Sequence, residues 1–240
     1  MSSLLDDLLD VSRITRGVLL LKKRCVPLRG LLDAAVETAQ PLLDAKGHRL
    51  DLDLTPLPLL LESDPVRITQ VVTNLLTNAA KYTDDGGHIT LGNRIESQSV
   101  VIYVRDNGIG LAPDMLTRVF DMFTQVEAET KRSDGGLGIG LALVKGLVGL
   151  HGGRVEARSA GIGRGSEFLV TLPHSVVAGR TGAQAPCGRQ AQGTRRRLRS
   201  SRDEAHGSGG ARAADRGGGH ASGPRIAWLR SPDEQARFAA

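Results

Sequence analysis

Apolar residues are concentrated in the first 173 of the 240 residues, which limits the chain to one folded domain. The 67 residues after Pro173 include only six Leu, Ile, Val and Phe residues, about 9%, and chains below roughly 20% do not pack a core. We therefore expect residues 174–240 to be a disordered tail. Their Arg-, Gly- and Ala-rich, Lys-free composition is also typical of an out-of-frame reading of GC-rich coding sequence, so both interpretations stay open.

The positive charge of the chain lies in this tail. The tail has twelve arginines and five acidic residues, a net charge of +7, so residues 1–173 carry −2 of the overall +5. The positive net charge of the whole chain therefore does not indicate nucleic-acid binding by the folded part. Since no apolar run approaches the roughly 18 residues of a membrane span, we expect a cytoplasmic chain without a membrane segment, compatible with a membrane-anchored longer parent. Cys25 and Cys187 form no CxxC pattern and predict neither a disulfide framework nor a zinc site.

Hydrophobic periodicity predicts four helices before Pro173. The first, Leu4–Val18, has one apolar face and starts without a cap, which suggests that the chain begins inside an element whose other half is missing. The second runs from Pro27 to a glycine stop at Gly47. The third begins at Pro65 behind a Ser63 or Asp64 cap, and the fourth spans 138–150.

Alternating apolar and polar residues predict strands between these helices, at 48–55, 59–61, 88–95, 99–105, 154–158 and 166–172. Helices and strands in this order predict an α/β sandwich, a mixed sheet with helices on one face. The roughly 30 residues after Asp106 hold few periodic apolar positions, a length that favours a lid.

The first of three polar clusters lies on the third predicted helix. Asn74 and Asn78 are four residues apart and share one helical face, with Lys81 a further turn along. Two amide oxygens and an ammonium on one stripe suit a hydrated divalent cation and a polyphosphate. The alternative is an ordinary solvated face, which the apolar neighbours of both asparagines disfavour.

The other two clusters are rich in glycine. Asp106-Asn107-Gly108-Ile109-Gly110 follows an apolar strand, where a carboxylate can accept from an exocyclic amine, although such a sequence is also a common turn. Gly135-Gly136-Leu137-Gly138-Ile139-Gly140-Leu141 opens the fourth helix, whose free N–H groups form a phosphate cradle. The latter lacks the Lys-Ser/Thr of a Walker loop and follows no strand, which excludes P-loop and Rossmann sites.

In this order and spacing, the clusters resemble the ATP-binding domain of sensor histidine kinases, in the Bergerat (GHKL) superfamily that also holds gyrase and MutL. The matching motifs are the N box 74–83, the first glycine box 106–110, the F box 120–123, the second glycine box 136–141 and the last glycine motif 161–168. The resemblance implies the Bergerat fold and three parts. Residues 1–26 would end a dimerisation hairpin, residues 27–173 would form the kinase domain, and residues 174–240 would be the tail.

The resemblance assigns roles to the N box and to the acidic residue. Asn78 would bind Mg²⁺, with Asn74 supporting it, and Lys81 would contact the phosphates of ATP. Tyr82 would flank the adenine, and Asp106 would accept a hydrogen bond from its amino group.

The glycine boxes and the lid are assigned in the same way. Gly108 and Gly110 would give clearance for the adenine. Arg132 would lie near the γ-phosphate, with Lys131 as its neighbour. The cofactor-binding residues of the second glycine box, which would close the lid and present N–H groups to the phosphates, would be Gly136, Gly138, Gly140 and Leu141.

The implied activity is that of a protein histidine kinase in two-component phosphorelay signalling, which moves the γ-phosphate of Mg·ATP to a histidine. None of the six histidines lies in a His-Glu/Asp-Leu-Arg-x-Pro setting, so we expect the acceptor upstream of Met1 and no autophosphorylation of this chain. Expected partners are a dimerisation hairpin, a response regulator or receiver domain, and a second copy.

Two alternatives stay open. A Bergerat-fold ATPase is disfavoured because the hydrolases have a Glu at the place of Asn74, and an amide cannot act as a base. A non-catalytic nucleotide-binding module is favoured by the missing acceptor.

Overall fold

The computed structural model describes residues 2–124, 138–173 and 175–177. The helices are α1 (Ser2–Thr15), α2 (Leu28–Ala45), α3 (Pro65–Tyr82), α4 (Met115–Arg118) and α5 (Gly140–Leu150). The strands are β1 (Arg24–Pro27), β2 (Arg49–Leu54), β3 (Leu59–Ser63), β4 (His88–Glu96), β5 (Ser99–Asp106), β6 (Arg154–Arg158), β7 (Ser166–Pro173) and β8 (Ser175–Val177). The tail predicted to be disordered lies outside the described residues from Ala178 onward, as does the second half of the predicted lid.

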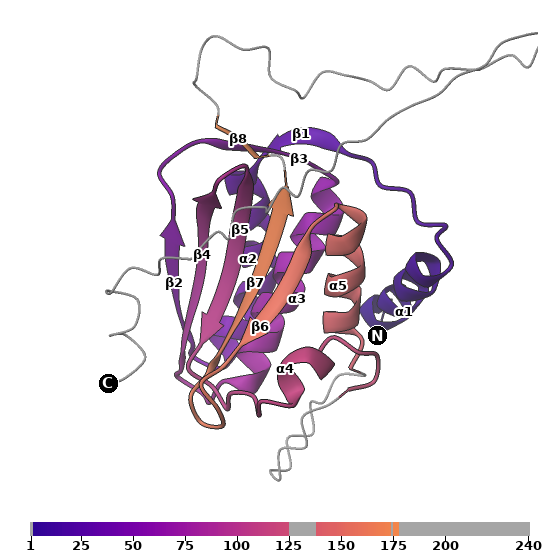
Figure 1. Ribbon diagram of the computed structural model, residues 1–240. Coiled ribbons are helices and arrows are strands. Elements are labelled where there is room, and N and C mark those ends of the chain that lie inside the picture. The colour runs from indigo at the N-terminus through magenta and orange to yellow at the C-terminus, as the bar shows by residue number, and fades with distance from the viewer. Residues whose placement is uncertain (1, 125–137, 174, 178–240) are drawn as a thin grey trace, which may run out of the picture. The chain divides into compact units, whose positions relative to one another are not determined.

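A five-stranded mixed sheet forms the centre, in the order β2-β4-β5-β7-β6. β2 runs parallel to β4, and the other neighbours are antiparallel. In Figure 1, α2 and α3 lie behind this sheet, and α5 lies beside α3 next to the β6 edge. The fully buried core includes Leu75 and Leu76 of α3, Ile102 of β5 and Leu143 of α5. The predicted sandwich with helices on one face is confirmed.

A second, three-stranded sheet was not expected from the sequence. β1 and β8 both pair antiparallel with β3, in the order β1-β3-β8. β1 therefore crosses the boundary predicted after residue 26, and β8 lies beyond the one predicted at Pro173. Cys25 on β1 is disulfide-bonded, so the expectation of no disulfide is wrong for this residue.

The start of α3 is held by short-range and long-range contacts. The Asp64 carboxylate caps the helix by accepting from the backbone nitrogens of Val66 and Arg67 at 3.1 and 3.3 Å. Pro65 occupies the first turn, where no N–H partner is needed. The ring of His151, at the end of α5, accepts from the backbone nitrogen of Asp64. The first turn of α3, the helix that carries the N box, is therefore fixed in position.

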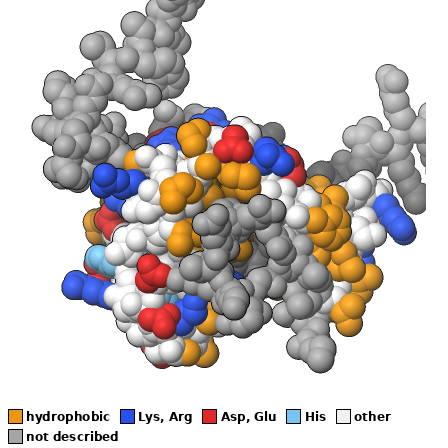
Figure 2. Space-filling model, turned by 90° about the horizontal axis from the view of Figure 1, so that it is seen from below, with side chains coloured by type: hydrophobic (Ala, Val, Ile, Leu, Met, Phe, Trp, Pro, Cys, Tyr) orange, Lys and Arg blue, Asp and Glu red, His pale blue; other side chains and the backbone are white. Residues whose placement is uncertain are grey.

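Helix α1 packs on α3 and α5 through one face. Val11 is buried, and a Cβ placed on Gly146 of α5 would lie 3.0 Å from a methyl carbon of Ile14. Leu5, Leu8 and Leu9 are exposed, and hydrophobic side chains gather on the side of the molecule where α1 lies (Figures 1 and 2).

The predicted end of α1 at Val18 is wrong by three residues. Gly17 takes a φ of +67°, and the nitrogens of Gly17 and Val18 bond back to the carbonyls of Ile14 and Arg13, which stops the helix at Thr15. In the part of the chain that the structure describes, no helix is long and apolar enough to cross a membrane.

Candidate functional site

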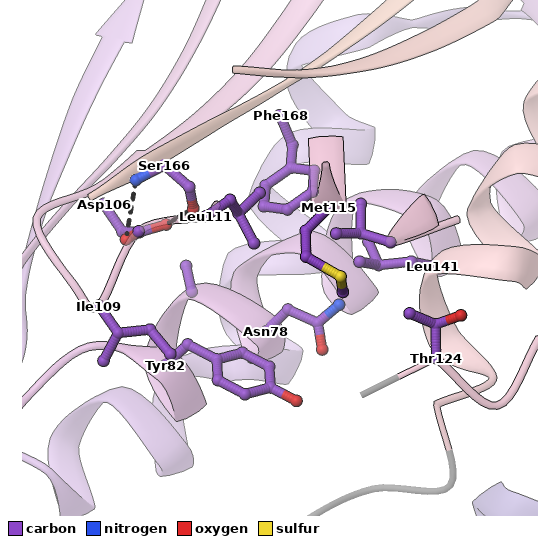
Figure 3. A pocket seen from close by; sticks show the side chains of 13 residues that line it. Asn78, Tyr82, Asp106, Ile109, Leu111, Met115, Thr124, Leu141, Ser166 and Phe168 are labelled. Atoms are coloured by element: carbon purple, nitrogen blue, oxygen red, sulfur yellow. Dashed lines mark hydrogen bonds between the residues drawn. The ribbon is translucent and has the colours of Figure 1, made fainter. Parts of the chain in front are cut away.

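A cavity opens between α3, the chain after β5, α4 and the start of α5 (Figure 3). It has an apolar part, with about 530 Å³ of open space, and a polar part. The residues that line both parts, and so join them, are Asn78, Tyr82, Val119, Thr124 and Leu141. The two parts therefore form one continuous cavity with an apolar end and a polar end.

The apolar part of the cavity has mostly hydrophobic walls. Its hydrophobic walls are Ile109, Leu111, Met115, Val119 and Phe168. In Figure 3, Asp106 and Ser166 lie at one end and Thr124 at the other, with Asn78 between them. Hydrophobic walls with a polar group at one end are typical of a site that holds an aromatic ring in one orientation.

Asp106 is the polar group at that end, and it is 7% exposed. Its Oδ2 accepts from the Ser166 hydroxyl at 2.6 Å, and its Oδ1 accepts from the backbone nitrogens of Gly108 and Ser166 at 2.9 and 3.3 Å. Burial raises the pKa of Asp106, and these hydrogen bonds oppose that rise. Because a carboxylate has about four acceptor positions, one remains for a ligand N–H.

The glycines after β5 make close contacts with protein backbone. A Cβ on Gly108 would lie 2.2 Å from the carbonyl oxygen of Tyr82, and one on Gly110 would lie 2.1 Å from that of Gly161. A Cβ on Gly165 would lie 2.1 Å from the carbonyl oxygen of Asp106. These positions require glycine because two loops and the end of α3 meet here. Gly110 lines the cavity, whereas the space at Gly108 is filled by backbone and is not left for a ligand.

The polar part is bounded by α3 and by the start of α5. Asn74, Asn78 and Lys81 contribute from α3, and Gly138 and Gly140 contribute from the second glycine box. Ile139, the N-cap of α5, makes no side-chain cap hydrogen bond within the described residues. The first amide groups of α5 are thus left for an anion.

Asn74 carries a buried donor that needs an acceptor. Its Nδ2 has no hydrogen-bond partner among the described residues, and a Cβ on Gly140 would lie 4.0 Å from it. A buried N–H without a partner costs about 1–3 kcal/mol, so such groups usually mark a place for water or ligand. An oxygen-rich anion between Asn74 and α5 would supply that acceptor.

The structure brings most of the predicted site residues to one cavity. Those that line it are Asn74, Asn78, Lys81, Tyr82, Asp106, Gly110, Gly138, Gly140 and Leu141. Arg132, Lys131 and Gly136 lie outside the described residues.

Sequence reasoning missed several lining residues. Ser166 lies in the last glycine motif, but only the pairing of β5 with β7 sets it opposite Asp106. Met115 and Thr124 come from the predicted lid, and Asp7 comes from α1. No local pattern marks Asp7, since its position depends on how α1 packs.

Residues 63–176 match the family described as histidine kinase-, DNA gyrase B-, and HSP90-like ATPase. The circadian input-output histidine kinase CikA of Synechococcus elongatus is 35% identical over 176 residues, which are 72% of this chain and 23% of that protein. The chain belongs to this ATPase family. The sensor protein SrrB of Staphylococcus aureus is 31% identical to the ATPase-family chain over 173 residues, 72% of this chain and 29% of SrrB. The chain thus spans about a quarter of the length of these relatives.

Solved structures agree with the ATPase-family assignment. Full-length ShkA in complex with AMPPNP has a TM-score of 0.63 and 30% identity, covering 73% of this chain and 36% of ShkA. The histidine kinase AdeS of Acinetobacter baumannii has a TM-score of 0.59 and 25% identity, covering 72% of this chain and 78% of AdeS.

Proposed function

We propose that this ATPase-family domain binds Mg·ATP in the cavity and is the catalytic part of a sensor histidine kinase. The observation that carries the proposal is the polarity of one continuous cavity. Asp106 lies at the apolar end, and Asn74, Asn78 and Lys81 lie at the polar end beside the start of α5, where the Ile139 side chain makes no cap hydrogen bond. The AMPPNP complex of the similar ShkA supports an adenine nucleotide as the ligand.

The apolar part would select adenine through Asp106. The Ser166 hydroxyl and the Gly108 nitrogen hold the carboxylate in place, and Asp106 and Tyr82 both line the apolar part. Since an ionised carboxylate accepts but does not donate, it fits the 6-amino group of adenine and opposes the 6-oxo group of guanine.

The polar part suits a phosphate-bound Mg²⁺. Among the described residues, no three His, Cys, Asp or Glu side chains are grouped to hold a metal ion. Mg²⁺ needs few protein ligands when phosphates and water complete its shell, so the amide oxygen of Asn78 would suffice. Lys81 and the Asn74 amide would then meet phosphate oxygens. When bound, the metal neutralises phosphate charge and orients the terminal group.

The amide at position 74 favours transfer over hydrolysis. A carboxamide cannot take a proton from attacking water, so Asn74 would hold the phosphate chain without activating a water molecule. The terminal Pγ–O bond would instead break as a histidine nitrogen forms a bond to phosphorus, with ADP leaving. A dimerisation hairpin would present that histidine, and a response regulator or receiver domain would take the phosphoryl group next.

The test mixes the full chain, labelled ATP and Mg²⁺ with a separately made dimerisation hairpin. We expect acid-labile label on the hairpin and none on this chain. A hairpin whose acceptor histidine is replaced by Gln, and an Asn78→Ala variant of this chain, should both abolish the label.

Other outcomes support the alternatives. Rapid release of inorganic phosphate without the hairpin would indicate an ATPase. Tight ATP binding without transfer to any hairpin would indicate a binding module. Absence of ATP binding would overturn the proposal.

A further inference from the structure

Two acidic residues of α1 contact one stretch of α3. Both terminal nitrogens of the Arg67 guanidinium donate hydrogen bonds to the Asp10 carboxylate, and the Asp10 side chain is only 8% exposed. The Gln70 amide donates to Oδ1 of Asp7 at 3.1 Å and to Oδ2 of Asp10 at 3.4 Å. A buried, bidentate ion pair has one favourable geometry, so these contacts fix the position of α1 on α3. We call the contacts of Asp7 and Asp10 with Arg67 and Gln70 the seat of α1.

With α1 in this seat, Asp7 lies in the wall of the proposed nucleotide cavity. Asp7 lines the polar part together with Asn74, Asn78 and Lys81. Burial raises the pKa of Asp7, the Gln70 hydrogen bond opposes this, and the charges of Asp10 and Asp6 raise it while that of Lys81 lowers it. Asp7 is therefore a partly desolvated carboxylate that interacts electrostatically with Lys81.

The rest of the α1 interface is loosely filled. Val11 is buried and Ile14 contacts α5, but beside them a groove lined by Phe120 and Met122 stays open between α1 and α5. Leu5, Leu8 and Leu9 of α1 are largely exposed. α1 is therefore held by the apolar contacts of Val11 and Ile14 together with the polar contacts of Asp7 and Asp10, and its release exposes few buried side chains.

We propose that α1 in this seat is an autoinhibitory element, in which Asp7 opposes the entry of a nucleotide triphosphate beside Lys81. The inference rests on the proposed function, since it needs ATP phosphates in the polar part. Like charges that share one partly desolvated cavity repel, so seating of α1 and binding of ATP disfavour each other. Release of α1 would remove the carboxylate from the site.

The test compares Asp7→Asn with Asp6→Asn in the full chain. Both variants lose one negative charge from the same helix, but Asp6 is exposed and is not among the residues that line the cavity. Calorimetry measures the affinity for ATP, Mg·ATP and adenosine. We expect Asp7→Asn to bind ATP and Mg·ATP about three- to tenfold more tightly, because one unfavourable charge pair is removed. Adenosine affinity should not change, and Asp6→Asn should resemble the parent.

A second variant separates charge from seating. Gln70→Ala removes the amide that holds both acidic residues while leaving the cavity charges in place. It should also tighten ATP binding, and its effect should not add to that of Asp7→Asn, because both act through one seat. In the parent, ATP should speed hydrogen exchange of the α1 amides.

Three results would overturn the inference. Weaker Mg·ATP binding by Asp7→Asn would make Asp7 a metal ligand. Equal ATP affinities of parent and Asp7→Asn would show that the carboxylate does not oppose the phosphates, while the proposed function would stand. A parent chain that binds no ATP would overturn both.

Discussion

The ring of His151 joins the end of α5 to the first turn of α3. Its Nε2 accepts from the backbone nitrogen of Asp64 at 3.1 Å, and its Nδ1 lies 2.8 Å from the carbonyl oxygen of Leu147. Together the two contacts require a neutral ring with its proton on Nδ1, because only an unprotonated nitrogen accepts. The start of the N box helix thus depends on one tautomer of one histidine.

The stability of the domain should therefore fall at mildly acidic pH. Burial lowers the pKa of His151, as does the charge of Lys23, while the Leu147 carbonyl and Asp64 act in the opposite direction. Because the pKa is lower in the folded state, the unfolded state binds the proton first. The stabilisation is complete above about pH 6.5 and is lost as pH falls through the folded pKa. Denaturant unfolding between pH 8 and pH 5 should show this loss in the parent and a smaller one in His151→Gln.

Asp106→Asn should reduce the preference for ATP over GTP. The asparagine oxygen can still accept from Gly108, and the Ser166 hydroxyl can turn to accept from the new amide, so the fold should survive. The amide no longer discriminates a donor from an acceptor on the purine, and ATP affinity should fall about tenfold. Titration with both nucleotides tests this, with Asp51→Asn on the edge strand β2 as the control. A parent with equal affinities for ATP and GTP would already contradict the prediction.

Asn78→Ala should remove the dependence of ATP affinity on Mg²⁺. The alanine leaves α3 intact but takes away the amide oxygen at the junction of the two parts of the cavity. ATP titrations with Mg²⁺ and with EDTA should differ for the parent and coincide for the variant. Gln98→Ala, which deletes an exposed amide in the turn between β4 and β5, should behave like the parent. A retained Mg²⁺ effect in Asn78→Ala would assign the metal to other ligands.

Gly108→Ala should destabilise the domain by about 1–3 kcal/mol, the usual cost of overpacking. The added methyl group would collide with the carbonyl oxygen of Tyr82, which also accepts from the Ile109 nitrogen at 3.0 Å. The control is Gly30→Ala in α2, where a Cβ meets nothing within 4 Å and alanine should stabilise the helix by about 0.5–1 kcal/mol. Equal melting temperatures for the two variants would show that the loop can move aside.

The elements that the sequence predicted correctly are those with strong local signals. The third helix begins behind Asp64 as predicted, because a side-chain cap and an N1 proline act within one turn. Gly47 ends α2 at a φ of +63°, as the glycine stop predicts. The strands β1 and β8 have four and three residues, too few for a periodic pattern, and are stabilised by pairing with β3.

For the site, the sequence alone determined which residue types lie within a helical turn or a short loop of one another. Asn74, Asn78 and Lys81 share a face because the helix repeats every 3.6 residues. Only the tertiary structure decided which segments meet: Ser166 against Asp106 through the β5–β7 register, and Asp7 beside Lys81 through the seat of α1. Such contacts join residues 60 or more positions apart, and they form only when the chain closes long loops around a common core, which local spacing does not encode.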